Sequence, residues 1–253
     1  MEKMSTARPI VLSLAGFDPS AGAGVLADIK TFEIHKVYGL SVITGNTIQT
    51  ENRFLKIEWV NTDWVIDSLK FLSEQYRVDA VKIGIVPNLK TLDEYVTIIR
   101  QHWPNCKIVW DPVLKATTDF EFLKIENEML YTLLTKIDLI TPNHIELETL
   151  VPIANTHEER AKQLAKHTAV LWKGGHNTHQ LGTDVLYYQG KQYVFKPKVE
   201  KIFPKHGSGC ILSSAITSQL TLGNSLTTSC QLAKDFIEQT LNTNHTLLAY
   251  YVT

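Results

Sequence analysis

The sequence predicts an α/β fold with a mostly parallel central sheet. Short, almost continuously apolar runs recur along the chain and end in glycine or a polar residue, as expected of strands buried on both faces. The segments between these runs carry apolar residues at helical spacing. With 253 residues, of which 44% are hydrophobic, the chain can bury a large core, and no repeat or Pro/Gly-rich linker divides it. We therefore expect a single domain over residues 1–253.

Composition and charge favour a small-molecule ligand. The formal net charge of -1 gives no reason to expect nucleic acid or an anionic membrane surface as the main partner. We expect neither a signal peptide nor a membrane helix, because no apolar run has the required length. Cys106, Cys210 and Cys230 are too far apart for a disulfide framework or a metal cluster, so we expect a cytoplasmic protein.

Residues 9–34 predict a strand, a loop and a helix. The apolar strand spans residues 9–15, the loop residues 16–24, and residues 25–34 have apolar positions at helical spacing. The loop matches neither the dinucleotide-binding fingerprint nor the Walker A pattern, which disfavours a nicotinamide enzyme or a P-loop kinase. Its glycines could simply form the turn.

A second strand is predicted at residues 40–47 and leads into a polar loop that holds Gln49. Ligands of open α/β sheets lie at strand ends, and an amide can both donate to and accept from the edge of a heterocycle. A lone glutamine in a loop is more often only solvated. Residues 54–60 predict an edge strand and residues 63–76 an amphipathic helix. The residues of that helix expected in the core are Trp64, Ile66, Leu69 and Leu72.

Two further apolar runs, residues 78–85 and 107–113, flank a predicted helix at residues 89–101. The second run closes on Asp111, which places a carboxylate at the carboxyl edge of the sheet, where it could help hold a metal ion or its water. The alternative is that Asp111 caps the following turn. Residues 117–123 predict a polar loop that could close over a ligand.

Residues 136–148 pass from a strand through Thr-Pro into a helix. Asn143 and Glu146 lie three residues apart and share one face of that helix. An amide oxygen and a carboxylate in this arrangement could organise Mg²⁺ and its waters beside a nucleotide phosphate. Alternatively, Asn143 is the N-cap of the helix and Glu146 its capping-box partner.

Lys173 follows the next apolar strand, within residues 168–176, and precedes two glycines. A lysine at a strand end is a natural counter-charge for a phosphate group. Residues 185–188 and 191–195 are separated by Gln-Gly and predict a hairpin at one edge of the sheet. Residues 226–241 predict a long amphipathic helix.

Residues 206–210, His-Gly-Ser-Gly-Cys, lead directly into a predicted buried helix. Two glycines allow the backbone to approach an anion, and the free amides and dipole of a helix start favour negative charge. A cysteine in the first turn should have a lowered thiol pKa, so Cys210 could accept a proton. Ser208 could instead be an ordinary cap, and Cys210 a buried core residue.

Five segments in order carry recognisable motifs: GFDPSAGAG at residues 16–24, ADIKT at 27–31, TPN at 141–143, KGGH at 173–176 and HGSGC at 206–210. Together they resemble the hydroxymethylpyrimidine/phosphomethylpyrimidine kinases of thiamin biosynthesis, which belong to the ribokinase-like superfamily. The resemblance covers nearly the whole chain. In the last motif, Ser208 stands where the family usually has threonine.

The resemblance implies a three-layer α/β/α sandwich without the large lid domain of sugar kinases, and usually a homodimer. It implies ATP and Mg²⁺ as co-substrates, with phosphorylation first of the hydroxymethyl group of the pyrimidine and then of the monophosphate. The pyrimidine-pocket residues that it implies are Ala23, Asp28, Gln49, Ile85, Val113 and Cys210. The implied catalytic loop consists of Gly207, Ser208, Gly209 and Cys210. The implied nucleotide-binding residues are Asn143, Lys173 and His206, and the implied magnesium-binding residues are Glu146 and Asp111.

Two other functions stay open at this stage. Pyridoxal also presents a hydroxymethyl group on a six-membered nitrogen heterocycle, and related pyridoxal kinases carry the same Gly-x-Gly-Cys loop. The motif at residues 16–24 and the absence of a recognisable lid favour the pyrimidine. A ligand-binding or regulatory protein could keep the fold without the chemistry. The presence of Asn143, Glu146, Lys173 and Cys210 together favours an enzyme.

Overall fold

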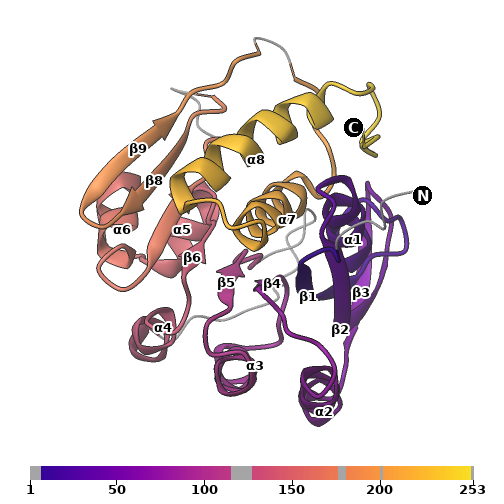
Figure 1. Cartoon of the computed structure of the whole chain (residues 1–253). Helices are drawn as coiled ribbons and strands as arrows, with labels where there is room; N and C mark the ends of the chain where they lie inside the picture. The colour runs from indigo at the N-terminus through magenta and orange to yellow at the C-terminus, as the bar shows by residue number, and fades with distance from the viewer. Residues whose placement is uncertain (1–6, 115–126, 176–180, 200–201, 252–253) are drawn as a thin grey trace.

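The computed structural model describes residues 7–114, 127–175, 181–199 and 202–251 (Figure 1). Their strands form one nine-stranded sheet in the order β3-β2-β1-β4-β5-β6-β7-β8-β9. Strands β1 to β9 span, in turn, Ile10–Phe17, Tyr38–Gln49, Phe54–Trp59, Ala80–Ile83, Lys107–Trp110, Leu139–Ile140, Ala169–Trp172, Asp184–Tyr188 and Lys191–Phe195. The six strands from β2 to β7 in this order are parallel. This confirms the predicted mostly parallel sheet.

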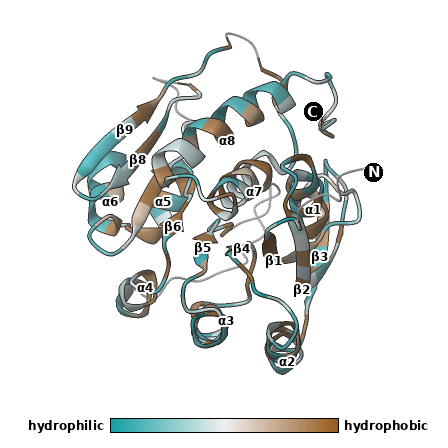
Figure 2. Ribbon diagram, in the orientation of Figure 1, coloured by the Kyte–Doolittle hydropathy of each residue, from teal (hydrophilic) through white to brown (hydrophobic). Residues whose placement is uncertain are grey.

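Antiparallel strands form both edges of the sheet. At one edge β3 pairs with β2, as predicted for an edge strand. At the other edge β8 and β9 form the predicted hairpin, paired from Asp184↔Phe195 to Tyr188↔Lys191. Its two-residue turn has positive φ at Gln189 and Gly190, the backbone that matches the twist of tight hairpins. Strand β9 is largely hydrophilic, as suits an exposed edge (Figure 2).

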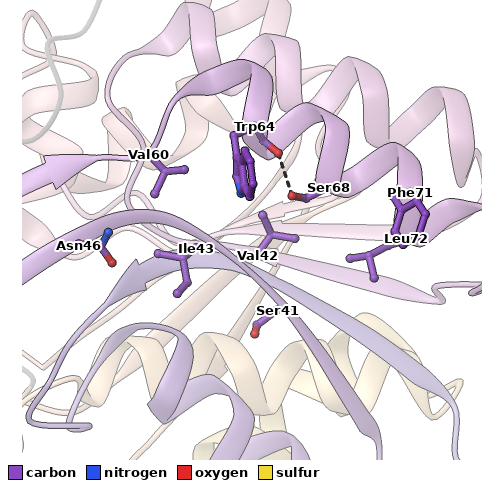
Figure 3. Close-up of a pocket in the computed structure, with 9 residues that line it drawn as sticks. All are labelled: Ser41, Val42, Ile43, Asn46, Val60, Trp64, Ser68, Phe71 and Leu72. Carbon is purple, nitrogen blue, oxygen red and sulfur yellow. Dashed lines mark hydrogen bonds between the residues drawn. The ribbon is translucent and has the colours of Figure 1, made fainter.

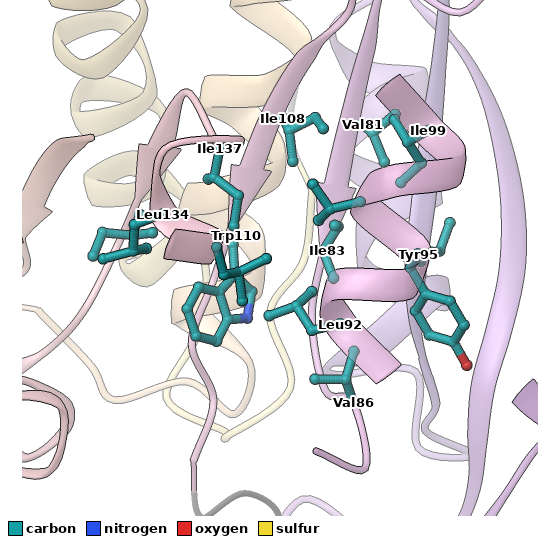
Figure 4. Packing of buried hydrophobic residues seen from close by; sticks show 14 of the residues in the cluster. Val81, Ile83, Val86, Leu92, Tyr95, Ile99, Ile108, Trp110, Leu134 and Ile137 are labelled. Atoms are coloured by element: carbon teal, nitrogen blue, oxygen red, sulfur yellow. The ribbon is translucent and has the colours of Figure 1, made fainter. Parts of the chain in front are cut away.

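Helices cover both faces of the sheet and complete three layers (Figure 1). Helices α1 to α8 span, in turn, Gly24–Ile34, Thr62–Ser73, Leu89–His102, Asn127–Leu134, His144–Leu150, His157–Leu164, Ser208–Thr221 and Leu226–Leu241. Helices α2 to α6 pack on one face in the larger core cluster, and α1, α7 and α8 pack on the other. Figure 4 shows the larger cluster, where Leu92 and Ile99 of α3 meet Ile83 and Trp110 of the sheet. The predicted α/β/α sandwich is confirmed.

Capping side chains explain where several helices begin. Asn61 precedes α2 and Asn88 precedes α3, and each side chain accepts a hydrogen bond from an amide of the first helical turn. Thr156 and Ser225 do the same for α6 and α8. Such caps satisfy amides that have no acceptor within the helix, so these helix starts are determined locally by sequence.

Helix α2 corrects one core prediction. Val65 and Leu69 lie four residues apart and are fully buried, while Ile66 and Leu72 pack partly against them. Trp64 was expected in the core but is 71% exposed, so that prediction is wrong. A surface helix buries one stripe, and successive residues point about 100° apart, so Trp64, next to the buried Val65, lies outside that stripe.

The helix predicted at residues 226–241 is confirmed as α8, with the same bounds. None of the helices in the described part of the chain has the length and apolar character of a membrane span. The loop at residues 117–123, predicted to close over a ligand, lies outside the described residues.

Candidate active site

The carboxyl ends of the parallel strands bring the predicted site residues to one edge of the sheet. Strands β1 and β4 are neighbours although β2 and β3 lie between them in sequence, so the strand order reverses there. Ligands of open α/β sheets bind at such a switch point. Asp18 directly follows β1, Ile85 follows β4, Asp111 follows β5 and Lys173 follows β7. These four residues therefore lie in the loops where a ligand is expected.

Lys173 connects two buried carboxylates at this edge. Its Nζ donates to Oδ1 of Asp111 at 2.7 Å and lies 3.6 Å from Oε2 of Glu146. Asp111 is fully buried and also accepts a hydrogen bond from the Thr141 hydroxyl at 2.9 Å. The side chain of Asp111 thus joins loops from β5, β6 and β7, and Lys173 is the cation at the centre of the group.

Burial and the charges of neighbouring residues shift the pKa values of Glu146, Asp111 and Lys173 to different extents. Burial raises the pKa of Glu146 to about 7, with Asp111 acting in the same direction and Lys173 against it. Burial opposes the charge of Asp111, but Lys173 and Lys82 outweigh it and hold its pKa below the ordinary value. Burial also opposes the charge of Lys173, but Asp111 and Glu146 outweigh it and raise the pKa of the ammonium. Lys173 and Asp111 are therefore ionised at neutral pH, while Glu146 titrates near it.

Asn143 and Glu146 form a capping box at the start of α5. Oδ1 of Asn143 accepts from the amide of Glu146 at 2.9 Å, and Oε2 of Glu146 accepts from the amide of Asn143 at 2.6 Å. This confirms the capping alternative raised by the sequence. Glu146 nonetheless approaches Lys173 with the same carboxylate, so the cap also orients a charge towards the site.

Helix α7 begins beside Lys173. Gly207 is its N-cap, with a φ of 74°, so Ser208 is the first helical residue and not the cap. The first intrahelical bond joins the amide of Ile211 to the carbonyl of Gly207, which leaves the amides of Gly209 and Cys210 ahead of it. A Cβ placed on Gly209 would lie 3.2 Å from Nζ of Lys173. An ammonium group and a helix start thus converge on one point, an arrangement suited to a phosphoryl group.

Cys210 does not have the lowered pKa that the sequence predicted. Burial raises the pKa of its thiol, Asp28 and Asp111 act in the same direction, and Lys82 and a hydrogen bond from the Gly24 amide only partly oppose them. The prediction of a thiolate is therefore wrong: Cys210 is a thiol at neutral pH. The helix dipole alone did not decide the charge, because burial of the thiol, assisted by the two carboxylates, opposes ionisation.

Behind Cys210 lies a buried ion pair that sequence reasoning missed. Both Asp28 and Lys82 are fully buried, and Nζ of Lys82 lies 2.9 Å from each carboxylate oxygen. The hydroxyls of Ser13 and Ser214 each donate to Asp28 at 2.6 Å. A lysine within an otherwise apolar strand was the available signal, because a buried ammonium requires a partner.

The remaining predicted pocket residues occupy neighbouring loops. Ala23, Ile85 and Val113 are partly buried and follow β1, β4 and β5, which are adjacent in the sheet. Gln49 ends β2 three residues beyond Asn46, the last residue of β2 paired with β1. Gln49 therefore lies where the β2–β3 hairpin extends past β1. Contact of these residues with a pyrimidine stays a prediction.

A separate groove, mostly apolar, lies between β2 and α2. It has a volume of about 500 Å³ (Figure 3). Val42 and Ile43 of β2 and Trp64, Phe71 and Leu72 of α2 are among its lining residues. It contains none of the residues predicted for catalysis, so we treat it as a surface separate from the active site.

Taken together, the parallel sheet, its switch point and the convergence of Lys173 with the start of α7 define a kinase of the ribokinase-like class. The chain belongs to the phosphomethylpyrimidine kinase family, whose model matches residues 18–252.

The chain is similar to phosphomethylpyrimidine kinases and also to a pyridoxal kinase of known structure. The hydroxymethylpyrimidine/phosphomethylpyrimidine kinase of Aquifex aeolicus is 35% identical over 247 residues, which cover 94% of this chain and 96% of the relative. The phosphomethylpyrimidine kinase of Clostridium difficile 630 has a TM-score of 0.76 at 31% identity and covers 92% of this chain and 99% of its own. Bacillus subtilis pyridoxal kinase, solved as an ADP complex, has a TM-score of 0.80 at 26% identity, with 94% and 93% covered.

Proposed function

We propose that this chain uses ATP to phosphorylate 4-amino-5-hydroxymethyl-2-methylpyrimidine and then its monophosphate, giving the diphosphate for thiamin biosynthesis. One observation carries the proposal: Nζ of Lys173 lies 3.2 Å from the Cβ position of Gly209, beside amides that precede the first bond of α7. Relatives named for both phosphorylation steps support the choice of substrate.

The residues at the sheet edge suit an in-line transfer. The hydroxyl oxygen of the acceptor forms a bond to the γ-phosphorus while the bond from that phosphorus to ADP breaks. The ammonium of Lys173 and the amides of Gly209 and Cys210 stabilise the charge on the transferring oxygens, as preorganised donors do in other phosphoryl transfers. Asn143, the N-cap of α5, is the further residue proposed to shape the nucleotide site.

Cys210 is proposed to hold the acceptor hydroxyl. Its thiol is partly buried in the first turn of α7 and interacts with the Gly24 amide, at the start of α1. In a loose transition state the hydroxyl proton leaves late, so the neutral thiol can orient the hydroxyl. Only the thiolate form, which has already lost its own proton to solvent, can accept the hydroxyl proton and return to the thiol. Ala23, Gln49, Ile85 and Val113 are the other residues proposed to line the pyrimidine pocket. Asp28, which was predicted with them, is fully buried and held by Lys82, Ser13 and Ser214.

The donor set at Asp111 and Glu146 fits Mg²⁺. Lys173 contacts Oδ1 of Asp111 and Oε2 of Glu146, so each carboxylate has a second oxygen that this lysine does not contact. Oδ2 of Asp111 has a long contact of 3.4 Å from the Ser213 hydroxyl. Magnesium sites in kinases need only one or two protein carboxylates, with phosphates and waters as the other ligands. We propose that these two residues hold the ion, which supplies positive charge to the nucleotide phosphates when it is bound.

A second candidate activity is the phosphorylation of pyridoxal. It is favoured by one specific observation, the likeness to Bacillus subtilis pyridoxal kinase at 26% identity over 94% of this chain. Both acceptors are hydroxymethyl groups on six-membered nitrogen heterocycles, so the same phosphoryl site could serve either. We rank the pyrimidine first because its family matches the chain from residue 18 to residue 252.

The decisive experiment supplies purified protein with Mg·ATP and, separately, the hydroxymethylpyrimidine, its monophosphate and pyridoxal, and identifies the products by mass. Formation of the pyrimidine mono- and diphosphates is the expected result. Pyridoxal phosphate as the sole product would reject the pyrimidine assignment, and nucleotide binding without any phosphorylated product would reject the kinase assignment.

We further propose that the chain is one cytoplasmic kinase domain that pairs with a second copy through the groove between β2 and α2 (Figure 3). Trp64 and Phe71 in this groove are 71% and 69% exposed, and soluble monomers rarely leave such neighbouring apolar side chains uncovered.

Light scattering should therefore give a mass of twice the 28.6 kDa of one chain. The variant Trp64→Ser with Phe71→Ser should be a monomer because it removes the apolar contact. Ile153→Ser, at an even more exposed apolar residue outside the groove, is the control and should stay dimeric. A wild-type mass of one chain would contradict the pairing.

A further inference from the structure

Two loops from distant parts of the chain lie directly against each other near the site. Nε2 of His206 lies 2.9 Å from Oδ2 of Asp18. A Cβ on Gly22 would lie 2.6 Å from Cδ2 of His206, and a Cβ on Gly207 would overlap the carbonyl oxygen of Gly22. The loop before α1 and the loop before α7 therefore touch through glycine backbone, with no room for a side chain between them.

Asp18 is the centre of this contact. It is 1% exposed, and its Oδ2 accepts from the Ala23 amide at 2.8 Å as well as from His206, while its Oδ1 accepts from the Ser20 amide at 2.9 Å. Burial opposes the charge, but the bonds from His206, Ser20 and Ala23 outweigh it and hold the pKa of Asp18 below its ordinary value. Asp18 is therefore a permanent acceptor at neutral pH.

The hydrogen bond between His206 and Asp18 belongs to a series of contacts that leads back to Cys210. Ala23 is the N-cap of α1, and its backbone amide donates to the carboxylate of Asp18, which therefore holds the start of this helix. The next amide, that of Gly24, interacts with Cys210. The path from His206 through Asp18, Ala23 and Gly24 thus returns to Cys210, four residues after His206.

The backbone of the α7 loop is held independently of the His206 side chain. The amide of His206 donates to the carbonyl of Leu247 at 2.9 Å. Nζ of Lys205 donates to the carbonyls of Asn244 and Thr246 at 2.6 and 2.8 Å. Because the segment after α8 anchors this loop, replacing the imidazole should leave the fold intact.

We propose that Asp18 and His206 are a positioning pair that sets the distance between the acceptor loop at Ala23 and the phosphoryl-binding start of α7. The inference rests on the proposed kinase function. His206 then acts through Asp18 and not on the nucleotide, which differs from the role implied by the family resemblance. Since phosphoryl transfer depends on the approach of two bound groups, loss of the pair should lower kcat and leave nucleotide affinity unchanged.

The test compares His206→Leu, which removes the donor, with His206→Gln, whose amide keeps a donor near the Nε2 position. We expect His206→Leu to lower kcat by about 10- to 100-fold, His206→Gln to recover most of it, and both to bind a non-hydrolysable ATP analogue within about twofold of wild type. Combining Asp18→Asn with His206→Leu should cost less than the sum of the two single variants, because the link between the two side chains can be lost only once. His102→Leu, at an exposed histidine of α3, is the control.

Amide hydrogen exchange gives a readout that needs no turnover. Exchange in residues 20–24 and 207–210 should rise in His206→Leu but not in His206→Gln. Weaker analogue binding with unchanged kcat would overturn the inference, because His206 would then contact the nucleotide. Equal losses in both variants with a lowered melting temperature would overturn it too, since His206 would then be only structural. Absence of turnover in wild type rejects the proposed function instead, and the exchange data still decide on the pair.

Discussion

At the scale of single residues, the buried charged side chains determine the electrostatics of the site. Lys82 and Asp28 form an ion pair that is fully buried from water. Lys173 and Asp111 form a second ion pair that is almost as deeply buried. An unpaired buried charge is costly, so each of these residues depends on its partner. The two pairs lie behind and beside Cys210, respectively, and both influence its protonation.

Removing one member of the inner pair should destabilise the protein strongly. Lys82→Met leaves the carboxylate of Asp28 buried with only hydroxyl donors, so the free energy of unfolding should fall by about 3–5 kcal/mol in urea denaturation. Asp28→Leu combined with Lys82→Met should lose less than the sum of the single variants, because no charge stays unpaired. Strictly additive losses would show that the two side chains do not interact.

Glu146 should make stability depend on pH. Its pKa is raised from 4.5 to about 7 in the folded protein, so the folded state binds the proton more tightly than the unfolded state. The stabilisation is complete below pH 4.5 and is lost as pH rises through about 7. Glu146→Gln keeps a capping-box residue but cannot titrate. The difference in unfolding free energy between wild type and Glu146→Gln should therefore shift against wild type over this range, and a constant difference would contradict the raised pKa.

Cys210 should give the pH–rate profile an alkaline limb. Burial raises the pKa of its thiol, so the thiolate fraction and with it kcat should increase as the solution becomes alkaline. Cys210→Ala should lose this limb and lower kcat by roughly 10² to 10⁴ where wild type is most active. Steady-state kinetics across pH check the prediction, and unchanged turnover in the variant would remove Cys210 from the mechanism.

At the scale of elements, the start of α7 combines two glycines with different tasks. Gly207 adopts a left-handed backbone and touches the loop before α1, while Gly209 leaves space beside Lys173. The left-handed backbone of Gly207 is needed for folding, whereas the absence of a side chain at Gly209 is needed for the anion site. Helix α7 also packs on α1 and α8, so this helix start is held from both sides.

The two glycines should therefore respond differently to alanine. Gly207→Ala should lower the free energy of unfolding by more than about 1 kcal/mol, because the left-handed backbone and the contact with Gly22 both oppose a Cβ. Gly209→Ala should leave stability nearly unchanged but lower kcat/KM for ATP by about tenfold, since its Cβ would press on Lys173, which Asp111 holds in place. Urea denaturation and kinetics on the two variants check both statements, and equal effects would contradict the division of tasks.

At the scale of the whole molecule, the strand order creates the site. Because β1 lies between β2 and β4, the loops after β1, β4 and β5 meet at one edge, and α7 starts there after the chain has crossed the sheet. Loops remote in sequence thus become neighbours. Asp18 and His206 are 188 positions apart and Lys82 and Asp28 are 54 apart, yet both pairs are in hydrogen-bond contact.

The sequence by itself determined the kinds and order of the elements and the loops that hold polar residues. Apolar periodicity, capping residues such as Asn143 and the Gln-Gly turn are local patterns. Each depends only on residues close in sequence, so it can be recognised without knowing the fold. They predicted the sheet, the β8–β9 hairpin, helix α8 and the position of Lys173 and Asp111 at strand ends.

Only the tertiary structure decided which side chains face each other and what charge they carry. Trp64 lies outside the buried stripe of α2, and Lys82 pairs with Asp28. The pKa of Cys210 is raised first by burial and then by two nearby carboxylates. These outcomes depend on burial and on distances between residues far apart in the chain, and both quantities exist only once the chain has folded.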